Sequence, residues 1–252
     1  MKKIVLSLLA LCLLSACGGK DVSKITTNVS YAYVAVGETY NDLSVTTSPD
    51  EDGKVSYTSG DESIVTVDEE GVITGVGAGS TTLTITSEDN EEATKELNVY
   101  CYELVVMNDN PYDEAWEWTA AYDINQYAAD QTGKKKSAIA SKIIQSSFSY
   151  IGAGYSQAER FGPTYDCSSL IYTLYNKAYD INVGTYTGAM ATVLKDYKKD
   201  VDDIEVGDMI FGQGAGEYHV GIYLGNERMI HSGQSVGGVC VTSIYYGPFY
   251  QG

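Results

Sequence analysis

Short runs in which apolar residues alternate with polar ones fill residues 24–100 of this 252-residue chain. Residues 64–67 are Ile-Val-Thr-Val, and residues 82–86 are Thr-Leu-Thr-Ile-Thr. Glycine and aspartate clusters separate these runs, as turns separate the strands of antiparallel sheets. The pattern therefore predicts an all-β sandwich over residues 24–100.

The pattern changes to mixed helix and strand at residue 137. Apolar residues recur at helical spacing over 137–149, with Ser137 as a candidate N-cap, and again over 167–179. Strands are predicted at 209–212, 218–224, 227–231 and 239–244. Residues 137–252 are therefore expected to form an α+β domain, with helices packed on an antiparallel sheet.

Residues 101–136 lie between these two regions and are expected to form a linker. The sequence Asn-Asp-Asn-Pro at 108–111 breaks regular structure. A helix is predicted over 112–130, before Gly133.

The first sixteen residues have the organisation of a signal peptide. Two lysines precede an apolar run at 4–14, which is too short to span a membrane, and small residues follow it. Residues 14–17, Leu-Ser-Ala-Cys, resemble the bacterial lipoprotein lipobox, which implies cleavage before Cys17 and its lipidation. Residues 17–23 would then be a tether on the outer side of a bacterial membrane. An ordinary signal peptide that leaves Cys17 as a free thiol is the alternative.

Composition excludes some partners and metal sites. The formal net charge of −18 repels phosphate backbones, so no nucleic-acid binding is expected. No Cys-x-x-Cys pair is present, so no structural zinc site is expected, and no cofactor is predicted. In an exported protein Cys101 could pair with Cys240, although their spacing does not establish this disulfide.

Cys167 is the candidate nucleophile. Asp166 can cap the helix at 167–179, which places Cys167 in its first turn. Backbone N–H groups and the helix dipole stabilise a thiolate there, so a lowered thiol pKa is predicted. The alternative is an inert, buried cysteine at the start of a helix.

The chain contains only two histidines, His219 and His231, on neighbouring predicted strands. A three-residue loop at 224–226 would place them directly opposite each other, whereas a two-residue loop at 225–226 would place them on opposite faces. Glycine and asparagine favour the three-residue loop. His219 would then act as the base and His231 would orient its ring. The alternative is that both are ordinary strand residues.

Four motifs in order resemble the NlpC-type papain-like cell-wall peptidases: Asp-Cys-Ser at 166–168, Gly-Asp-Met-Ile-Phe at 207–211, His-Val-Gly-Ile-Tyr-Leu-Gly at 219–225 and Met-Ile-His-Ser at 229–232. The resemblance implies a cysteine endopeptidase that cuts peptidoglycan stem peptides, typically between D-isoglutamate and the diamino acid at position three. Its motifs place the nucleophile, base and orienter at Cys167, His219 and His231.

The same resemblance implies that Tyr150, Asp166 and Ser168 line the substrate pocket. Two departures from the family pattern occur. Ser169 replaces the usual glycine, and residues 150–154, Tyr-Ile-Gly-Ala-Gly, lack the tryptophan common in the family. The missing tryptophan affects the expected shape of the substrate subsite.

Residues 24–100 are similar to bacterial immunoglobulin-like domains of group two, and the similarity lies in the sequences at 55–59, 64–68, 71–75 and 78–83. Such domains commonly serve as stalks or adhesion modules. Two other functions remain compatible with the sequence as a whole. One is a catalytically inactive wall-binding or adhesion lipoprotein, and the other is a papain-like amidase or acyltransferase.

Overall fold

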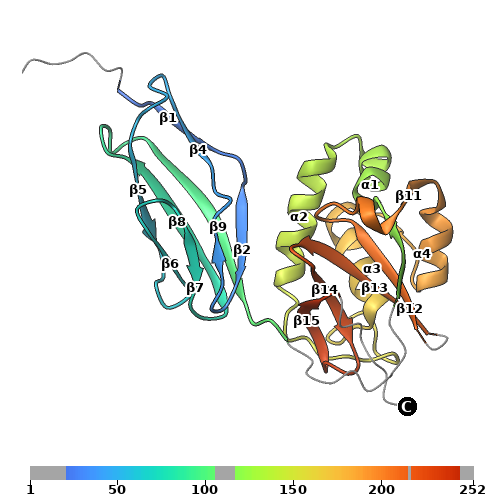
Figure 1. The fold of residues 1–252 in the computed structure, drawn as a ribbon. Helices are drawn as coiled ribbons and strands as arrows, with labels where there is room; N and C mark the ends of the chain where they lie inside the picture. The colour runs from blue at the N-terminus through green and yellow to red at the C-terminus, as the bar shows by residue number, and fades with distance from the viewer. Residues whose placement is uncertain (1–20, 106–116, 215–216, 245–252) are drawn as a thin grey trace, which may run out of the picture.

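The computed structural model describes residues 21–105, 117–214 and 217–244. It consists of an all-β lobe, residues 21–105, and a mixed lobe, residues 117–244 (Figure 1). This arrangement confirms the predicted fold class, an immunoglobulin-like sandwich followed by an α+β domain. The predicted signal peptide and Cys17 lie outside the described residues. No helix in the described ranges is long and apolar enough to cross a membrane.

The all-β lobe is built from nine strands in three sheets. The strands are β1 (Lys24–Thr27), β2 (Tyr31–Ala35), β3 (Thr39–Tyr40), β4 (Val45–Ser48), β5 (Val55–Ser59), β6 (Val65–Val67), β7 (Ile73–Gly75), β8 (Gly79–Ser87) and β9 (Thr94–Tyr102). The sheet orders are β2-β9-β8-β5, β3-β7-β6 and β1-β4. Alternate residues of β9, Leu97, Val99 and Cys101, are buried in the lobe's core, as the period of two requires.

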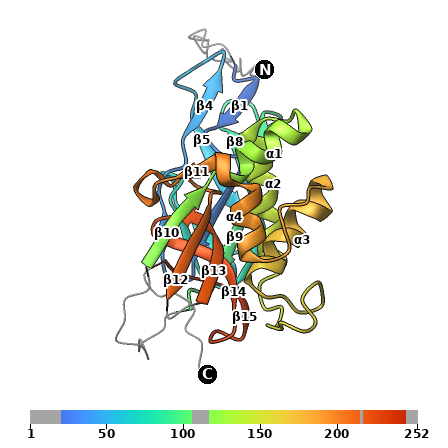
Figure 2. The same ribbon diagram turned by 90° about the vertical axis from the view of Figure 1, so that its right-hand side faces the viewer.

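The mixed lobe places helices against one face of a six-stranded sheet (Figure 2). Its helices are α1 (Ile124–Thr132), α2 (Lys136–Phe148), α3 (Cys167–Tyr179) and α4 (Thr187–Val193), with short 3-10 turns at Lys195–Tyr197 and Val201–Asp203. Its strands are β10 (Glu117–Tyr122), β11 (Lys198–Lys199), β12 (Met209–Gly214), β13 (Glu217–Gly225), β14 (Arg228–Gly233) and β15 (Gly238–Ser243). The order is β11-β10-β12-β13-β14-β15, and every pair is antiparallel.

The segment expected to be a linker contributes instead to this second lobe. Part of the helix predicted over 112–130 is strand β10, which pairs with β12 through Ala121 and Ile210. Helix α1 starts only after Asp123, whose carboxylate accepts the N–H of Gln126 at 2.9 Å. Sheet pairing outweighs local helical propensity in this segment. Residues 112–116 of the predicted helix lie outside the described residues.

The predicted helices of the mixed lobe are confirmed, with one difference at a terminus. Helix α3 spans Cys167–Tyr179, as predicted. Helix α2 begins at Lys136, and its N-cap position, Lys135, has no side-chain cap hydrogen bond. Ser137 therefore lies inside the first turn and is not the cap.

The two lobes pack against each other beside α2, which is the helix nearest β2 and β9 (Figure 1). The Tyr100 ring stacks on Phe148, with ring centroids 5.1 Å apart. The Tyr33 hydroxyl donates to the Leu224 carbonyl. Ala35 and Tyr102 of the all-β lobe are buried in the same core as the mixed lobe. The contact between the lobes thus combines packed aromatic rings with polar contacts, among them the ion pair between Arg228 and Glu38.

Candidate active site

Cys167 occupies the first turn of α3, as predicted, because Asp166 caps this helix. The Asp166 carboxylate accepts the N–H of Ser169 at 2.7 Å, and the Ser169 hydroxyl accepts the N–H of Asp166 at 2.9 Å. This reciprocal arrangement is a capping box. The serine that replaces the family's usual glycine therefore completes the cap.

The predicted lowering of the Cys167 thiol pKa is wrong. Burial of the thiol raises its pKa to about 12, and the negative charge of Asp166 also raises it. Hydrogen bonds from the backbone N–H groups of Val220 and Ser168 act in the opposite direction but do not outweigh the loss of hydration. The resting sulfur is therefore a neutral thiol, and it needs a base when it attacks.

Strands β13 and β14 form the predicted hairpin, but through a different turn. Asn226 and Glu227 have φ values of 48° and 58°, so a two-residue turn with both residues in the left-handed region closes the hairpin. A register shift between Tyr223 and Gly225 then leaves Leu224 as an extra residue. A two-residue loop alone would place His219 and His231 on opposite faces of the hairpin, and the extra residue returns them to the same face.

His219 and His231 meet on one face of this hairpin. Nε2 of His219 lies 3.0 Å from Nδ1 of His231, and both side chains are fully buried. Ile222 pairs with Ile230, so the histidines meet diagonally and not directly across the hairpin as predicted. Burial holds the pKa of His219 well below its usual value and lowers that of His231 to about 4. Both rings are therefore neutral.

The start of α3 lies against the strands that carry these histidines. The Cys167 sulfur lies at the backbone N–H of Val220, the residue that follows His219. The Ser232 hydroxyl of β14 donates to the carbonyl of Tyr165 at 2.7 Å, just before the helix cap. The structure thus brings the predicted nucleophile to the strand of the predicted base.

A side chain that the sequence interpretation missed, Arg160, holds two of the expected pocket residues. Its Nε lies 2.5 Å from a carboxylate oxygen of Asp166, and its Nη2 donates to the Ser168 hydroxyl at 2.9 Å. It also donates to the carbonyl of Thr185. An arginine six residues before a capping aspartate is a weak sequence signal, because only the folded loop brings them together.

The third expected pocket residue, Tyr150, lies just beyond α2. Its ring packs edge-to-face on Tyr165, with centroids 5.2 Å apart. The Lys177 ammonium donates to its hydroxyl at 3.3 Å. Tyr150 is thus linked, through Tyr165, to the segment that leads into the Asp166 cap.

Cys101 and Cys240 do not form the disulfide that the sequence left open. Both are free and buried. Cys101 lies in the core of the all-β lobe, whereas the Cys240 sulfur lies 3.9 Å from Nε2 of His231. The two cysteines thus belong to different lobes, and a bond between them would require rearrangement of both cores.

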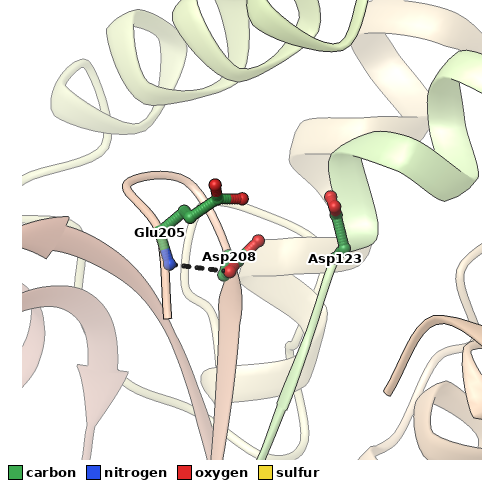
Figure 3. Close-up of side chains that lie close together, drawn as sticks. All are labelled: Asp123, Glu205 and Asp208. Atoms are coloured by element: carbon green, nitrogen blue, oxygen red, sulfur yellow. Dashed lines mark hydrogen bonds between the residues drawn. The ribbon is translucent and has the colours of Figure 1, made fainter. Parts of the chain in front are cut away.

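Three carboxylates lie close together near the start of β12, away from Gly212, which pairs with His219. Among the described residues, they form the group that could hold a cation. Oxygens of Asp123, Glu205 and Asp208 lie within 4.8 Å of one another (Figure 3). Two lysines form ion pairs with them. Lys136 Nζ contacts Asp123 at 2.5 Å and Glu205 at 2.9 Å, and Lys199 Nζ contacts Glu205 at 3.0 Å and Asp208 at 2.8 Å. The cluster is an ion-pair network that joins α1, α2 and β12, and it does not favour a metal.

Comparison with known proteins identifies both lobes. Residues 146–251 match the NlpC/P60 family, and residues 21–97 match the bacterial Ig-like domain (group 2). A Bacillus subtilis protein named gamma-D-glutamyl-L-lysine dipeptidyl-peptidase is 31% identical over 115 residues, which cover 42% of this chain and 38% of the relative. The probable peptidoglycan endopeptidase LytE of the same bacterium is 28% identical over 117 residues, covering 44% and 33% of the two chains.

Among solved structures, the NlpC/p60 domain of peptidoglycan hydrolase SagA is 28% identical, covers 42% of this chain and 89% of that chain, and gives a TM-score of 0.37. The chain spans less than two fifths of the length of the two Bacillus relatives. The chain therefore joins a bacterial Ig-like domain of group 2, at residues 21–97, to a domain of the NlpC/P60 family, at residues 146–251.

Proposed function

We propose that this protein is a cysteine endopeptidase that hydrolyses peptidoglycan stem peptides at the bond between D-isoglutamate and the diamino acid at position three. The Bacillus relatives support this substrate class, since one is named a gamma-D-glutamyl-L-lysine dipeptidyl-peptidase and another a probable peptidoglycan endopeptidase. A wall substrate also implies that the protein works outside the cytoplasm. Cleavage before Cys17 and its lipidation would anchor it to the membrane there.

One observation carries the proposal: His219 contacts His231 in a buried site, and the Cys167 sulfur lies at the N–H of Val220, the residue that follows His219. The neutral His219 imidazole faces His231 through Nε2, and its other ring nitrogen, Nδ1, is the proposed proton acceptor. A thiol that stays protonated at rest needs such a base. The Cys167, His219 and His231 side chains thus supply a nucleophile, a base and an orienter.

The reaction follows from these roles. The Cys167 thiol gives its proton to Nδ1 of His219 while the sulfur bonds to the scissile carbonyl carbon, which forms a tetrahedral oxyanion. The C–N bond then breaks, the amine of the diamino acid takes the proton from His219, and a thioester remains on Cys167. Water, deprotonated by His219, attacks the thioester and releases the isoglutamyl carboxylate and the free thiol.

Backbone N–H groups at the start of α3 are suited to the oxyanion. The capping box uses the N–H of Ser169, the third residue of the helix. The N–H of Cys167 precedes it, as does that of Ser168, which donates to the Cys167 sulfur at rest. The positive end of the helix dipole adds to their effect. We place Tyr150, Asp166 and Ser168 along the same side of the pocket, with Arg160 fixing the positions of Asp166 and Ser168.

Product masses from a muropeptide that retains its sugar test the bond. The proposal expects one fragment that ends in isoglutamate and one that begins with the diamino acid. Release of the whole stem peptide from the sugar would contradict it and indicate an amidase. Retention of intact muropeptide without turnover would indicate a wall-binding protein.

A further inference from the structure

The ring nitrogen of His231 that points away from His219 meets a buried hydroxyl on β15. Nε2 of His231 lies 3.0 Å from Oγ1 of Thr242, and the Thr242 side chain is fully buried. Cys240, which pairs directly with His231 across the strands, has its sulfur 3.9 Å from the same nitrogen. The thiol is a weak hydrogen-bonding group at that distance, so Thr242 is the closer and stronger partner.

The contacts of the two rings determine which nitrogen carries each proton. If Nδ1 of His219 accepts the thiol proton, Nε2 of neutral His219 must carry its hydrogen and donate to Nδ1 of His231. His231 must then carry its own hydrogen on Nε2, where Thr242 is the acceptor. The opposite tautomer of His231 would bring two N–H groups together at 3.0 Å, a repulsive arrangement.

We propose that Thr242 is a positioning residue of the active site, which holds His231 as the Nε2–H tautomer and thereby makes His219 the proton acceptor for Cys167. This inference rests on the proposed function of the three residues. In this role Thr242 acts only through His231. A neutral hydroxyl suits this role because both imidazoles are buried, and a carboxylate in its place would need to be desolvated.

The chain offers a sharp test, because it contains only two histidines. Nitrogen-15 NMR of the imidazoles distinguishes a protonated ring nitrogen from an unprotonated one. The proposal expects wild-type His231 to be protonated at Nε2 and unprotonated at Nδ1. A wild-type spectrum with His231 protonated at Nδ1 overturns it, whether or not the protein cuts any peptide.

Three variants then separate Thr242 from its neighbour. Thr242→Val keeps the shape of the side chain but removes the acceptor, so His231 should populate both tautomers and kcat should fall roughly tenfold with KM unchanged. Thr242→Ser should restore the wild-type spectrum and kcat, and Cys240→Ala should leave both unchanged. Wild-type nitrogen shifts in Thr242→Val, or the tautomer change in Cys240→Ala, would contradict the role of Thr242.

Discussion

His219 and His231 are joined through Nε2 and Nδ1 at 3.0 Å, although neither is the direct partner of the other across the β13–β14 hairpin. The bulge at Leu224 allows this contact, because it shifts the strand pairing by one residue and so places both rings on the same face. A slip of one residue would turn one ring to the other face of the sheet. The contact between the proposed base and its orienter therefore depends on the turn at Asn226 and Glu227 and on the bulge at Leu224.

Replacing His231 tests the orienting role. His231→Ala removes the acceptor for the Nε2–H of His219, so kcat should fall about 100-fold, with little change in KM. His231→Asn leaves a side-chain oxygen that can accept the same hydrogen, so its kcat should fall less. Steady-state kinetics on a stem peptide measure both. Equal kcat values for His231→Ala and wild type would show that His231 does not orient the base.

The buried histidines predict how stability depends on pH. Their pKa values are lowered in the folded state, to about 4 for His231, so the unfolded chain binds more protons below its histidine pKa of about 6.5. Stability should therefore be full above pH 7 and should fall by on the order of 2 kcal/mol per histidine between pH 7 and 5. Urea denaturation across this range measures the slope.

A matched variant identifies the source of this pH dependence. His231→Asn removes one of the two titrating rings, so the loss between pH 7 and 5 should be about half that of the wild type. A wild-type stability that stays flat over the same range would be inconsistent with two neutral, buried imidazoles.

Arg160 is predicted to stabilise the start of α3. Arg160→Met leaves the Asp166 carboxylate, whose side chain is 9% exposed, without its cation, so the free energy of unfolding should drop by about 3 kcal/mol. Arg160→Met with Asp166→Asn should recover part of this loss, because the buried charge is gone and asparagine can still cap the helix. Lys142→Met, at an exposed position of α2, is the control. Similar losses in Arg160→Met and this control would contradict the prediction.

Phe148 is predicted to hold the two lobes together. Its ring lies against Tyr100 at 5.1 Å, Tyr102 at 5.9 Å and Tyr33 at 6.0 Å between centroids. Phe148→Ala should cost about 3 kcal/mol of stability and raise the radius of gyration measured by small-angle X-ray scattering. Phe161→Ala removes a half-exposed ring as the control. An unchanged scattering curve for Phe148→Ala would mean that other contacts fix the lobes.

The elements with strong periodicity could be predicted from the sequence. Helix α3 was predictable from its apolar spacing and from the capping Asp166, and each end of the four strands β12–β15 was predictable to within two residues. Strand β10 was not, because residues 117–122 pair with β12, about ninety positions away in the sequence. Local patterns carry no information about such a partner.

Some features of the candidate site could also be predicted from the sequence, and others could not. The contact between His219 and His231 on one face of a hairpin and the position of Cys167 in the first turn of α3 could be predicted from the sequence. The predicted turn was wrong because Glu227 adopts a positive φ that its residue type disfavours. The sign of the Cys167 pKa shift was also wrong, since desolvation is a property of the packed site. Arg160 and Thr242 act through contacts that form only on folding.

The most direct test of the account compares wild-type protein, Cys167→Ala and Cys101→Ala on a purified stem peptide, followed by mass spectrometry. Cys101 is a free, buried cysteine in the other lobe, so its variant controls for the loss of any thiol. The account predicts cleavage after isoglutamate by wild type and Cys101→Ala, and intact peptide with folded Cys167→Ala. Cleavage by Cys167→Ala at the wild-type rate would contradict it.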